Sequence, residues 1–151
     1  MSKKIYNNAK VCVGGAISYL DKYLIVYKPK RKWWEFAGGK VDHGETLTKA
    51  VEREMFEETG FDVKAGAVVG VYSYPLKEGN SMVYLKFACE FRFPQTDIPV
   101  PKLSSEHTKY QWLTTREILK IDNISPILRN FAMEESEFIF DINPFIGKSG
   151  V

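Results

Sequence analysis

The sequence predicts an α/β protein of one domain, in which a mixed β-sheet is sandwiched by helices. The chain has 151 residues, of which 44% are hydrophobic and 26% are charged. This size and composition are typical of a single soluble domain with its own apolar core. Strand-like stretches dominate the first and middle parts of the chain, and helical stretches interrupt and follow them. We expect the domain to span residues 1–151, with frayed ends at residues 1–8 and about 144–151.

The first strands are predicted from apolar, β-branched and aromatic runs. Val11–Tyr19 and Tyr23–Lys28 are two such runs separated by a short turn, which is the pattern of a β-hairpin. Pro29 closes the second run, and Trp33–Phe36 is predicted to be a short aromatic strand. The next segment, residues 37–45, holds three glycines and is predicted to form turns.

The helix predicted from Thr46 to about Thr59 combines an apolar pattern with an acidic composition. Thr46 is a suitable N-cap residue, and Gly60 supplies the C-terminal stop. At about 100° per residue, the apolar side chains of the first turns fall on one stripe, and three glutamates continue along much the same stripe. The apolar residues are Leu47, Ala50 and Val51, and the glutamates are Glu54, Glu57 and Glu58.

The remaining predicted elements are strands and two short helices. In chain order they are strands at residues 63–74 and 82–93, a proline-rich loop at 93–102, a strand at 109–113, a helix from Thr114 or Thr115 to about Lys120, and a helix opened by Ser125 and Pro126.

The three glutamates repel one another as helical neighbours, so something must offset their charge. A divalent cation is the simplest candidate, because Mg²⁺ and Mn²⁺ prefer clustered carboxylate oxygens. Arg53 can neutralise part of the charge and hold a carboxylate in place. The preceding loop adds Gly38 and Gly39, whose backbone can approach a ligand closely, and Lys40, which can reach an anion. Together these groups predict a site for a pyrophosphate group.

These residues carry a family resemblance. Gly39, Glu45, the run Arg53-Glu54-Met55, the pair Glu57-Glu58 and the pair Gly60-Phe61 stand at the spacing of the Nudix box, and every fixed position matches. The chain therefore resembles the Nudix hydrolases, of the MutT-like kind. The resemblance implies a Nudix-type α/β/α sandwich with a mixed β-sheet. It also implies hydrolysis of a nucleoside diphosphate linked to another group, with Mg²⁺ or Mn²⁺ as cofactor.

The resemblance also implies roles for individual residues. Glu54, Glu57 and Glu58 become metal ligands, joined by the carbonyl of Gly38 and by Glu106, the best match to a later glutamate of the family. Glu54 or Glu57 serves as, or holds, the base for the attacking water, Glu106 is a further candidate for that role, and Arg53 orients the glutamates. Predicted substrate contacts come from Gly39, Lys40, Lys28 at a strand end, and Trp34.

Alternatives to these roles come from ordinary structural positions. Lys40 and Glu106 are alternatively exposed loop residues, and His107 is expected to be a surface or loop histidine. Trp33 and Trp34 point to opposite faces of a strand, so one is expected in the core and the other to stack on a base or ribose.

Several classes of function remain open at this stage. A nucleoside triphosphate is the first choice of substrate, and ADP-ribose or another nucleotide sugar is the second. A Nudix domain that binds a nucleotide without cleaving it, as a sensor, is the alternative of another class. Dimers are common among Nudix proteins, so a homodimer is a further expectation.

Charge and cysteine content exclude other classes. The 21 basic and 19 acidic residues leave a net charge of +2, which does not favour a dedicated nucleic-acid or membrane binder. Cys12 and Cys89 are too few for a disulfide framework and predict reduced thiols. The sequence shows no secretory segment and no apolar run of about 18 residues. We expect a cytoplasmic protein with a small-molecule nucleotide substrate, no membrane association and no stable nucleic-acid partner.

Overall fold

The computed structural model describes residues 8–134. The frayed ends predicted at residues 1–8 and about 144–151 lie outside these residues, except for Asn8, where the first strand begins. The chain divides into two compact units. The first contains Met1–Ile17 and Ala37–Ser104, and the second contains Ser18–Phe36 and Ser105–Val151. The single domain over residues 1–151 stays a prediction.

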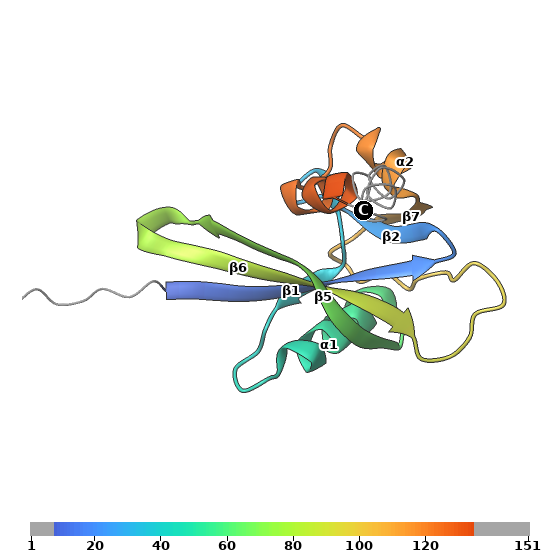
Figure 1. Cartoon of the computed structure of the whole chain (residues 1–151), viewed down its shortest axis with the longest axis horizontal. Coiled ribbons are helices and arrows are strands. Elements are labelled where there is room, and N and C mark those ends of the chain that lie inside the picture. Colours follow the sequence, from blue (N-terminus) through green and yellow to red (C-terminus); the bar gives the residue numbers. More distant parts are fainter. Residues whose placement is uncertain (1–7, 135–151) are drawn as a thin grey trace, which may run out of the picture. The chain divides into compact units, whose positions relative to one another are not determined.

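The first unit holds a mixed β-sheet and one long helix, shown in Figure 1. β1 pairs in parallel with β6 and antiparallel with β4, and β5 pairs antiparallel with β6. Helix α1 packs against β4 and β5. The elements are β1 (Asn8–Tyr19), β4 (Gly38–Lys40), α1 (Leu47–Thr59), β5 (Val63–Pro75), the 3-10 turn η1 (Lys77–Gly79) and β6 (Asn80–Phe91). The predicted mixed sheet is therefore confirmed, and the structure adds few helices to it.

Helix α1 begins and ends where the sequence predicts. The side-chain oxygen of Thr46 accepts a hydrogen bond from the backbone N–H of Lys49 at 3.3 Å. Gly60 adopts a left-handed conformation, with φ at 72°, and its N–H donates to the carbonyl of Phe56 at 2.8 Å. The apolar side of the helix is buried, and Ala50, Val51 and Met55 are all fully enclosed.

The second unit is built around strand β2. The end of β1 pairs with β2 through Ser18 and Tyr23, which confirms the predicted hairpin. β2 also pairs antiparallel with β3 and with β7. The elements are β2 (Lys22–Lys28), β3 (Trp33–Glu35), β7 (Lys109–Leu113), α2 (Thr115–Leu119) and a helical stretch at residues 126–134. The core of this unit contains Leu24, Ile25, Val26, Ile118, Leu128 and Phe131.

Strand β4 is the element that the sequence analysis missed. Gly38–Lys40 was assigned to a turn-rich segment, because two of its three residues are glycines and glycine is depleted in strands. The strand exists because Cys12, Val13 and Gly14 of β1 pair with it. Its conformation is therefore set by a partner strand far away in the sequence and not by local preference.

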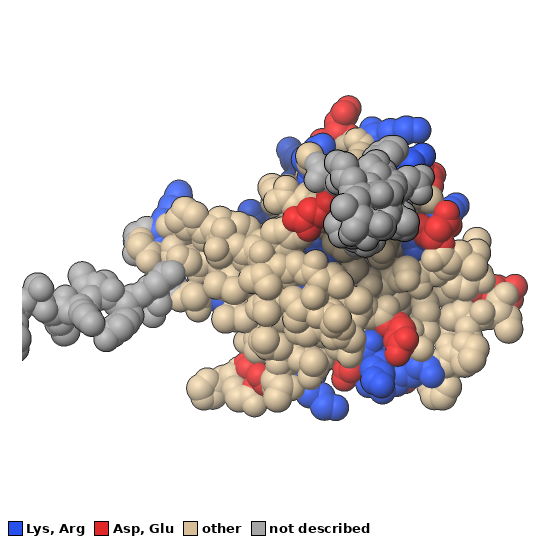
Figure 2. Space-filling view, in the orientation of Figure 1, with Lys and Arg blue, Asp and Glu red and all other residues tan. Residues whose placement is uncertain are grey.

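The surface of the described residues carries both signs of charge. On the face seen in Figure 2, acidic and basic side chains lie near one another. Within residues 8–134, no helix is long and apolar enough to cross a membrane. Cys12 and Cys89 are both buried free thiols, and burial raises the pKa of Cys89 to about 12.

Candidate active site

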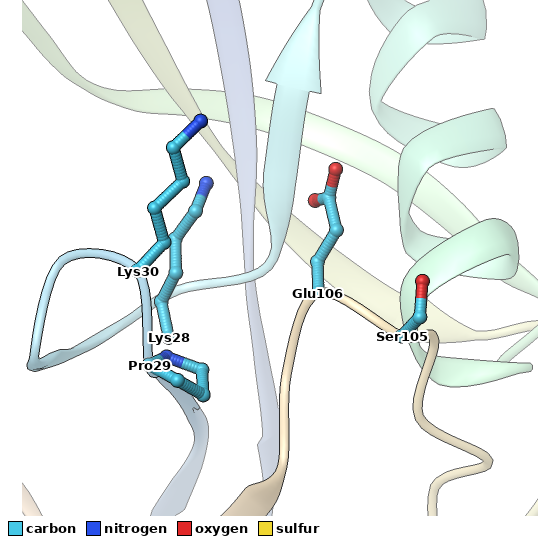
Figure 3. A pocket seen from close by; sticks show the side chains of 5 residues that line it. All are labelled: Lys28, Pro29, Lys30, Ser105 and Glu106. Carbon is cyan, nitrogen blue, oxygen red and sulfur yellow. The ribbon is translucent and has the colours of Figure 1, made fainter.

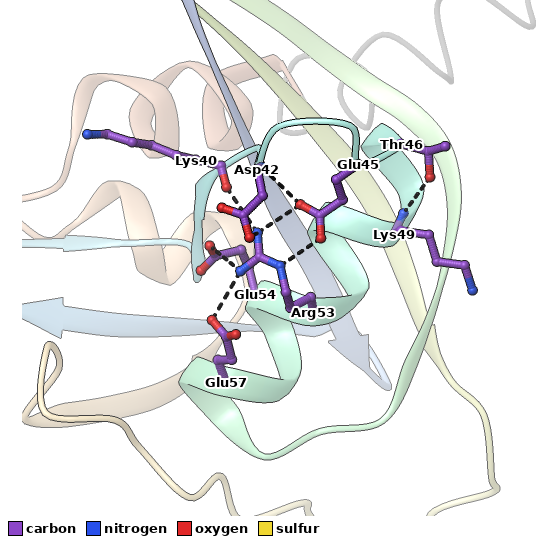
Figure 4. Close-up of polar contacts among 8 residues, drawn as sticks. All are labelled: Lys40, Asp42, Glu45, Thr46, Lys49, Arg53, Glu54 and Glu57. Atoms are coloured by element: carbon purple, nitrogen blue, oxygen red, sulfur yellow. Dashed lines mark hydrogen bonds and ion pairs between the residues drawn. The ribbon is translucent and has the colours of Figure 1, made fainter.

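Arg53 lies at the centre of the polar contacts of α1 (Figure 4). Its guanidinium group makes a two-pronged contact with Glu45, from Nε to Oε2 at 2.7 Å and from Nη2 to Oε1 at 2.9 Å. Nη1 donates to Glu54 at 2.9 Å and to Glu57 at 3.1 Å. Arg53 therefore holds three carboxylates of the box at fixed positions, and two of them converge on one nitrogen atom.

The same guanidinium group ties the preceding loop to the helix. Nη2 donates to the backbone carbonyl of Lys40 at 3.1 Å and lies 3.5 Å from the carboxylate of Asp42. The N–H of Asp42 donates to Glu45 at 3.1 Å. The side chain of Lys40 is exposed and points away from Arg53 (Figure 4), so its ammonium group is available to an anion.

The pKa values follow from this arrangement. Hydrogen bonds from the side chain of Arg53 and from the backbone of Asp42 lower the pKa of Glu45 to about 2. The hydrogen bond to Glu45 is also the main cause that raises the pKa of Arg53 above its ordinary value. Arg53 and Glu45 thus form an ion pair that persists through the whole physiological pH range.

Glycines allow the carboxylates to approach the chain closely. The N–H of Gly38 donates to Oε2 of Glu58 at 2.7 Å. A Cβ atom at Gly39 would lie 2.6 Å from the carboxylate atoms of Glu54, and one at Gly38 would lie 2.2 Å from the carbonyl oxygen of Val13. Any larger residue would therefore displace Glu54 or the pairing of β4 with β1.

Exposure differs among the three helical glutamates. Glu58 is buried, with 4% of its surface exposed. The side chain of Glu54 is 13% exposed and that of Glu57 is 56% exposed. The predicted stripe thus continues from apolar residues to Glu58 and Glu54, whereas Glu57 reaches the solvent.

Two of the predicted site residues, Lys28 and Glu106, line a pocket in the second unit (Figure 3). Lys28, Pro29, Lys30, Ser105 and Glu106 enclose about 280 Å³. Lys28 and Glu106 were both predicted from the sequence, and the structure brings them to one pocket. The box residues lie in the first unit.

Trp34 occupies a core position in the second unit. It is 8% exposed, and its ring lies 5.4 Å from that of Tyr27. Its neighbour Trp33 is half-buried and donates from Nε1 to Glu35 at 2.8 Å. Of the two tryptophans, Trp34 is therefore the core residue, and its contact with substrate stays a prediction.

Comparison with known proteins agrees with the box. Residues 15–134 match the NUDIX domain family. The chain belongs to the Nudix family. Nudix hydrolases generally use divalent metal ions and act on nucleotide-linked compounds.

Two curated relatives of this Nudix chain carry enzyme names. YvcI, a Nudix hydrolase of Bacillus subtilis, is 34% identical over 99 residues, which are 65% of this chain and 61% of the relative. An ADP-ribose pyrophosphatase of Methanocaldococcus jannaschii is 37% identical over 83 residues, or 53% of this chain and 49% of the relative. The matches thus span only about half to three fifths of these relatives. Several matching relatives are named as pyrophosphatases or phosphatases.

The solved structure supports the fold. The crystal structure of a MutT protein from Methanosarcina mazei has a TM-score of 0.71 at 24% identity, over 89% of this chain and 97% of the other. This likeness is one of fold.

The donors of the Nudix box suit a hard divalent cation, because all of them are oxygen atoms. Oxygens of Glu54 and Glu57 each lie about 3 Å from the same cationic nitrogen of Arg53. The carboxylates of Glu54 and Glu57 therefore stabilise a positive charge that lies between them. Within residues 8–134, no three carboxylate, histidine or cysteine side chains are arranged as a complete metal site. Glu54 and Glu57 are turned toward Arg53, and Glu58 toward Gly38.

Two features of the site had been missed in the sequence. Glu45 had been noted only as a fixed position of the box, and its role as the main partner of Arg53 comes from the structure. His107 lies in a loop as expected, but it is buried, with 3% of its surface exposed. It contacts Glu35, and a separation of 72 positions leaves no local pattern that would reveal the pair.

Proposed function

We propose that this Nudix protein is an Mg²⁺-dependent pyrophosphohydrolase. It cleaves a diphosphate linkage in a nucleoside triphosphate or in another nucleoside-diphosphate-linked compound, by attack of water on phosphorus. The observation that carries the proposal is the set of contacts from Arg53 to Glu45, Glu54 and Glu57. The complete box and the names of the relatives support it.

The ligands that would hold the metal are Glu54, Glu57, Glu58, the carbonyl of Gly38, and Glu106. When bound, Mg²⁺ supplies charge neutralisation at the phosphate oxygens and lowers the pKa of water. Mn²⁺ offers the same preference for oxygen ligands.

The protein's own residues orient the reactants. A carboxylate of Glu54 or Glu57 accepts the proton of the attacking water, with Glu106 as a further candidate. Arg53 fixes Glu54 and Glu57 through Nη1, and the N–H of Gly38 fixes Glu58. These contacts preset the geometry of the acids before substrate binds.

Cationic and backbone groups bind the phosphates. The exposed ammonium of Lys40 and the backbone at Gly39 contact the diphosphate, because both belong to β4, which Arg53 ties to α1 through the carbonyl of Lys40. Lys28 contributes a further cation from its pocket. Opposite charge at developing phosphate oxygens lowers the barrier to hydrolysis.

Two substrate classes follow, and their products differ. A nucleoside triphosphate yields the monophosphate and pyrophosphate. A nucleotide sugar such as ADP-ribose yields the monophosphate and a sugar phosphate. One relative is named as an 8-oxo-(d)GTP phosphatase and another as an ADP-ribose pyrophosphatase, so both classes belong in the first test.

Location and assembly are proposed separately. The two buried free thiols support a reducing compartment, and we place the protein in the cytoplasm. A homodimer stays a prediction, to be tested by light scattering.

The experiment is a substrate panel of nucleoside triphosphates, ADP-ribose, other nucleotide sugars and dinucleoside polyphosphates. Each is incubated with and without Mg²⁺, and the products are separated by chromatography. We expect Mg²⁺-dependent cleavage at a diphosphate linkage of at least one class. If no compound is cleaved while nucleotides still raise the melting temperature, the protein is a nucleotide-binding Nudix module and not an enzyme.

A further inference from the structure

The loop that carries Glu106 is anchored by the residues that follow it. Glu106 itself is exposed and lines the pocket with Lys28 and Lys30 (Figure 3). An exposed carboxylate on a loop cannot fix its own position. The next residue, His107, has a side chain that is only 1% exposed, and its Nε2 lies 3.1 Å from Oε2 of Glu35. A buried side-chain contact therefore stands one position away from the pocket.

The direction of this hydrogen bond follows from the chemistry of the pair. An ionised carboxylate only accepts, so Nε2 of His107 carries the proton and donates to Glu35. Nδ1 is buried and has no hydrogen-bond partner among the residues that the structure describes. Among the described residues, Glu35 is the hydrogen-bond partner of Nε2 of this buried imidazole. If that hydrogen bond is lost, Nε2 is left buried without a hydrogen-bond partner.

Glu35 is itself held in place by strand β3. Its other oxygen, Oε1, accepts from Nε1 of Trp33 at 2.8 Å. Trp33 pairs with Lys28 across the β2–β3 ladder. The carboxylate that binds His107 is therefore fixed to the strand residue opposite Lys28.

A second tether closes the ring. The N–H of Thr108 donates to the carbonyl of Tyr27 at 3.1 Å, and Tyr27 directly precedes Lys28. Starting from Lys28, the contacts run through Trp33, Glu35 and His107 to Thr108, and then back through Tyr27. Lys28 belongs to this ring, and Glu106 directly precedes its member His107, so the ring restricts where the backbone of Glu106 lies relative to Lys28.

We propose that the Glu35–His107 pair is a positioning device that holds Glu106 in place against Lys28 and Lys30. This inference rests on the proposed function, in which Glu106 acts on the reaction directly. Glu35 and His107 do not contact the substrate. They act through the loop, and their effect is on turnover more than on substrate binding.

The test combines kinetics with a double-mutant cycle. Glu35→Ala is expected to lower kcat by about ten- to a hundredfold and to change KM by less than about threefold, because misplaced catalytic groups slow the chemical step. In Glu35→Gln, the amide oxygen can still accept from Nε1 of Trp33. The amide N–H can donate to Nε2 of His107 when His107 carries its proton on Nδ1. This variant should therefore keep kcat within about threefold of the wild type. In a Glu106→Gln background, Glu35→Ala should cause less than about twofold further loss.

A second readout does not depend on activity. Hydrogen exchange at the amide of Thr108 should accelerate by about tenfold in Glu35→Ala, because the loop loses one of its two tethers. Glu117→Ala is the matched control. It removes a capping carboxylate of α2 and lowers stability without touching the loop, so it should leave exchange at Thr108 and kcat unchanged.

The outcomes separate the two proposals. The positioning role is overturned if the loss of kcat in the Glu35→Ala, Glu106→Gln double variant equals the product of the two single losses. It is also overturned if hydrogen exchange at the amide of Thr108 does not change in Glu35→Ala. If the wild type cleaves no substrate, the proposed function fails, and exchange at Thr108 then decides whether the pair holds the loop.

Discussion

Arg53 donates to both carboxylate oxygens of Glu45, eight positions earlier in the chain, at 2.7 and 2.9 Å. The planar guanidinium group presents two parallel N–H groups that match a carboxylate, and it still has Nη1 for Glu54 and Glu57. One side chain therefore connects the loop before α1 to the acids on the helix.

Replacement of Arg53 by lysine should disrupt this arrangement although the charge is kept. A single ammonium group cannot serve Glu45 and the two helical glutamates together. We expect Arg53→Lys to lower the free energy of unfolding by about 1–3 kcal/mol and turnover by at least about tenfold. The control is Arg92→Lys, because Arg92 makes its ion pairs with Asp62 and Glu52, neither of which is a fixed position of the box. Wild-type stability and turnover in Arg53→Lys, measured by thermal unfolding and kinetics, would contradict the role assigned to the guanidinium group.

Stability should depend on pH through Glu45. Its pKa falls from the ordinary 4.5 to about 2 in the folded protein, so the folded state favours the ionised form. A lowered folded-state pKa stabilises the protein above the unfolded-state value, and this contribution disappears as the pH falls from about 4.5 to about 2. Urea unfolding between pH 6 and pH 2.5 should show a weaker decline for Glu45→Gln than for the wild type. Parallel curves for the two proteins would argue against the pair. The control is Glu90→Gln, which removes an exposed carboxylate of β6.

Gly39→Ala should damage the site more than the fold. The added Cβ would meet the carboxylate of Glu54 at 2.6 Å, so the acid must move. We expect turnover to fall by at least about tenfold. Gly44→Ala is a matched control, because a Cβ there meets nothing within 4 Å and the cost comes only from φ at +77°. A Gly39→Ala enzyme no slower than Gly44→Ala would mean that the position of Glu54 does not matter.

Local sequence patterns predicted the elements that local chemistry determines. Thr46 and Gly60 bound α1 as expected, because caps act within a few residues. Strand β4 was missed, since its pairing with β1 overrides the preference of two glycines. The box spacing predicted which acids lie together on α1 beside Arg53, but the contact between Glu35 and His107 joins residues 72 positions apart. Only the folded chain brings such residues together.

Metal binding should stabilise the folded protein. A ligand that binds the folded state alone raises the melting temperature, and Mg²⁺ at about ten times its Kd should add about 3–6 °C. Differential scanning fluorimetry with Mg²⁺ and with Mn²⁺ measures the shift, and Glu57→Gln should reduce it. Identical melting temperatures with and without either ion would count against a metal site at the box.

The most direct test of the central claim is the Mg²⁺-dependent turnover of Glu57→Gln beside that of Glu90→Gln. Both variants remove one exposed carboxylate charge, but only Glu57 belongs to the box. We predict that Glu57→Gln keeps the melting temperature of the metal-free wild type and loses at least about a hundredfold in kcat/KM, while Glu90→Gln behaves as wild type. A Glu57→Gln protein that hydrolyses every substrate of the panel at the wild-type rate would contradict the assignment of the metal and catalytic site to α1.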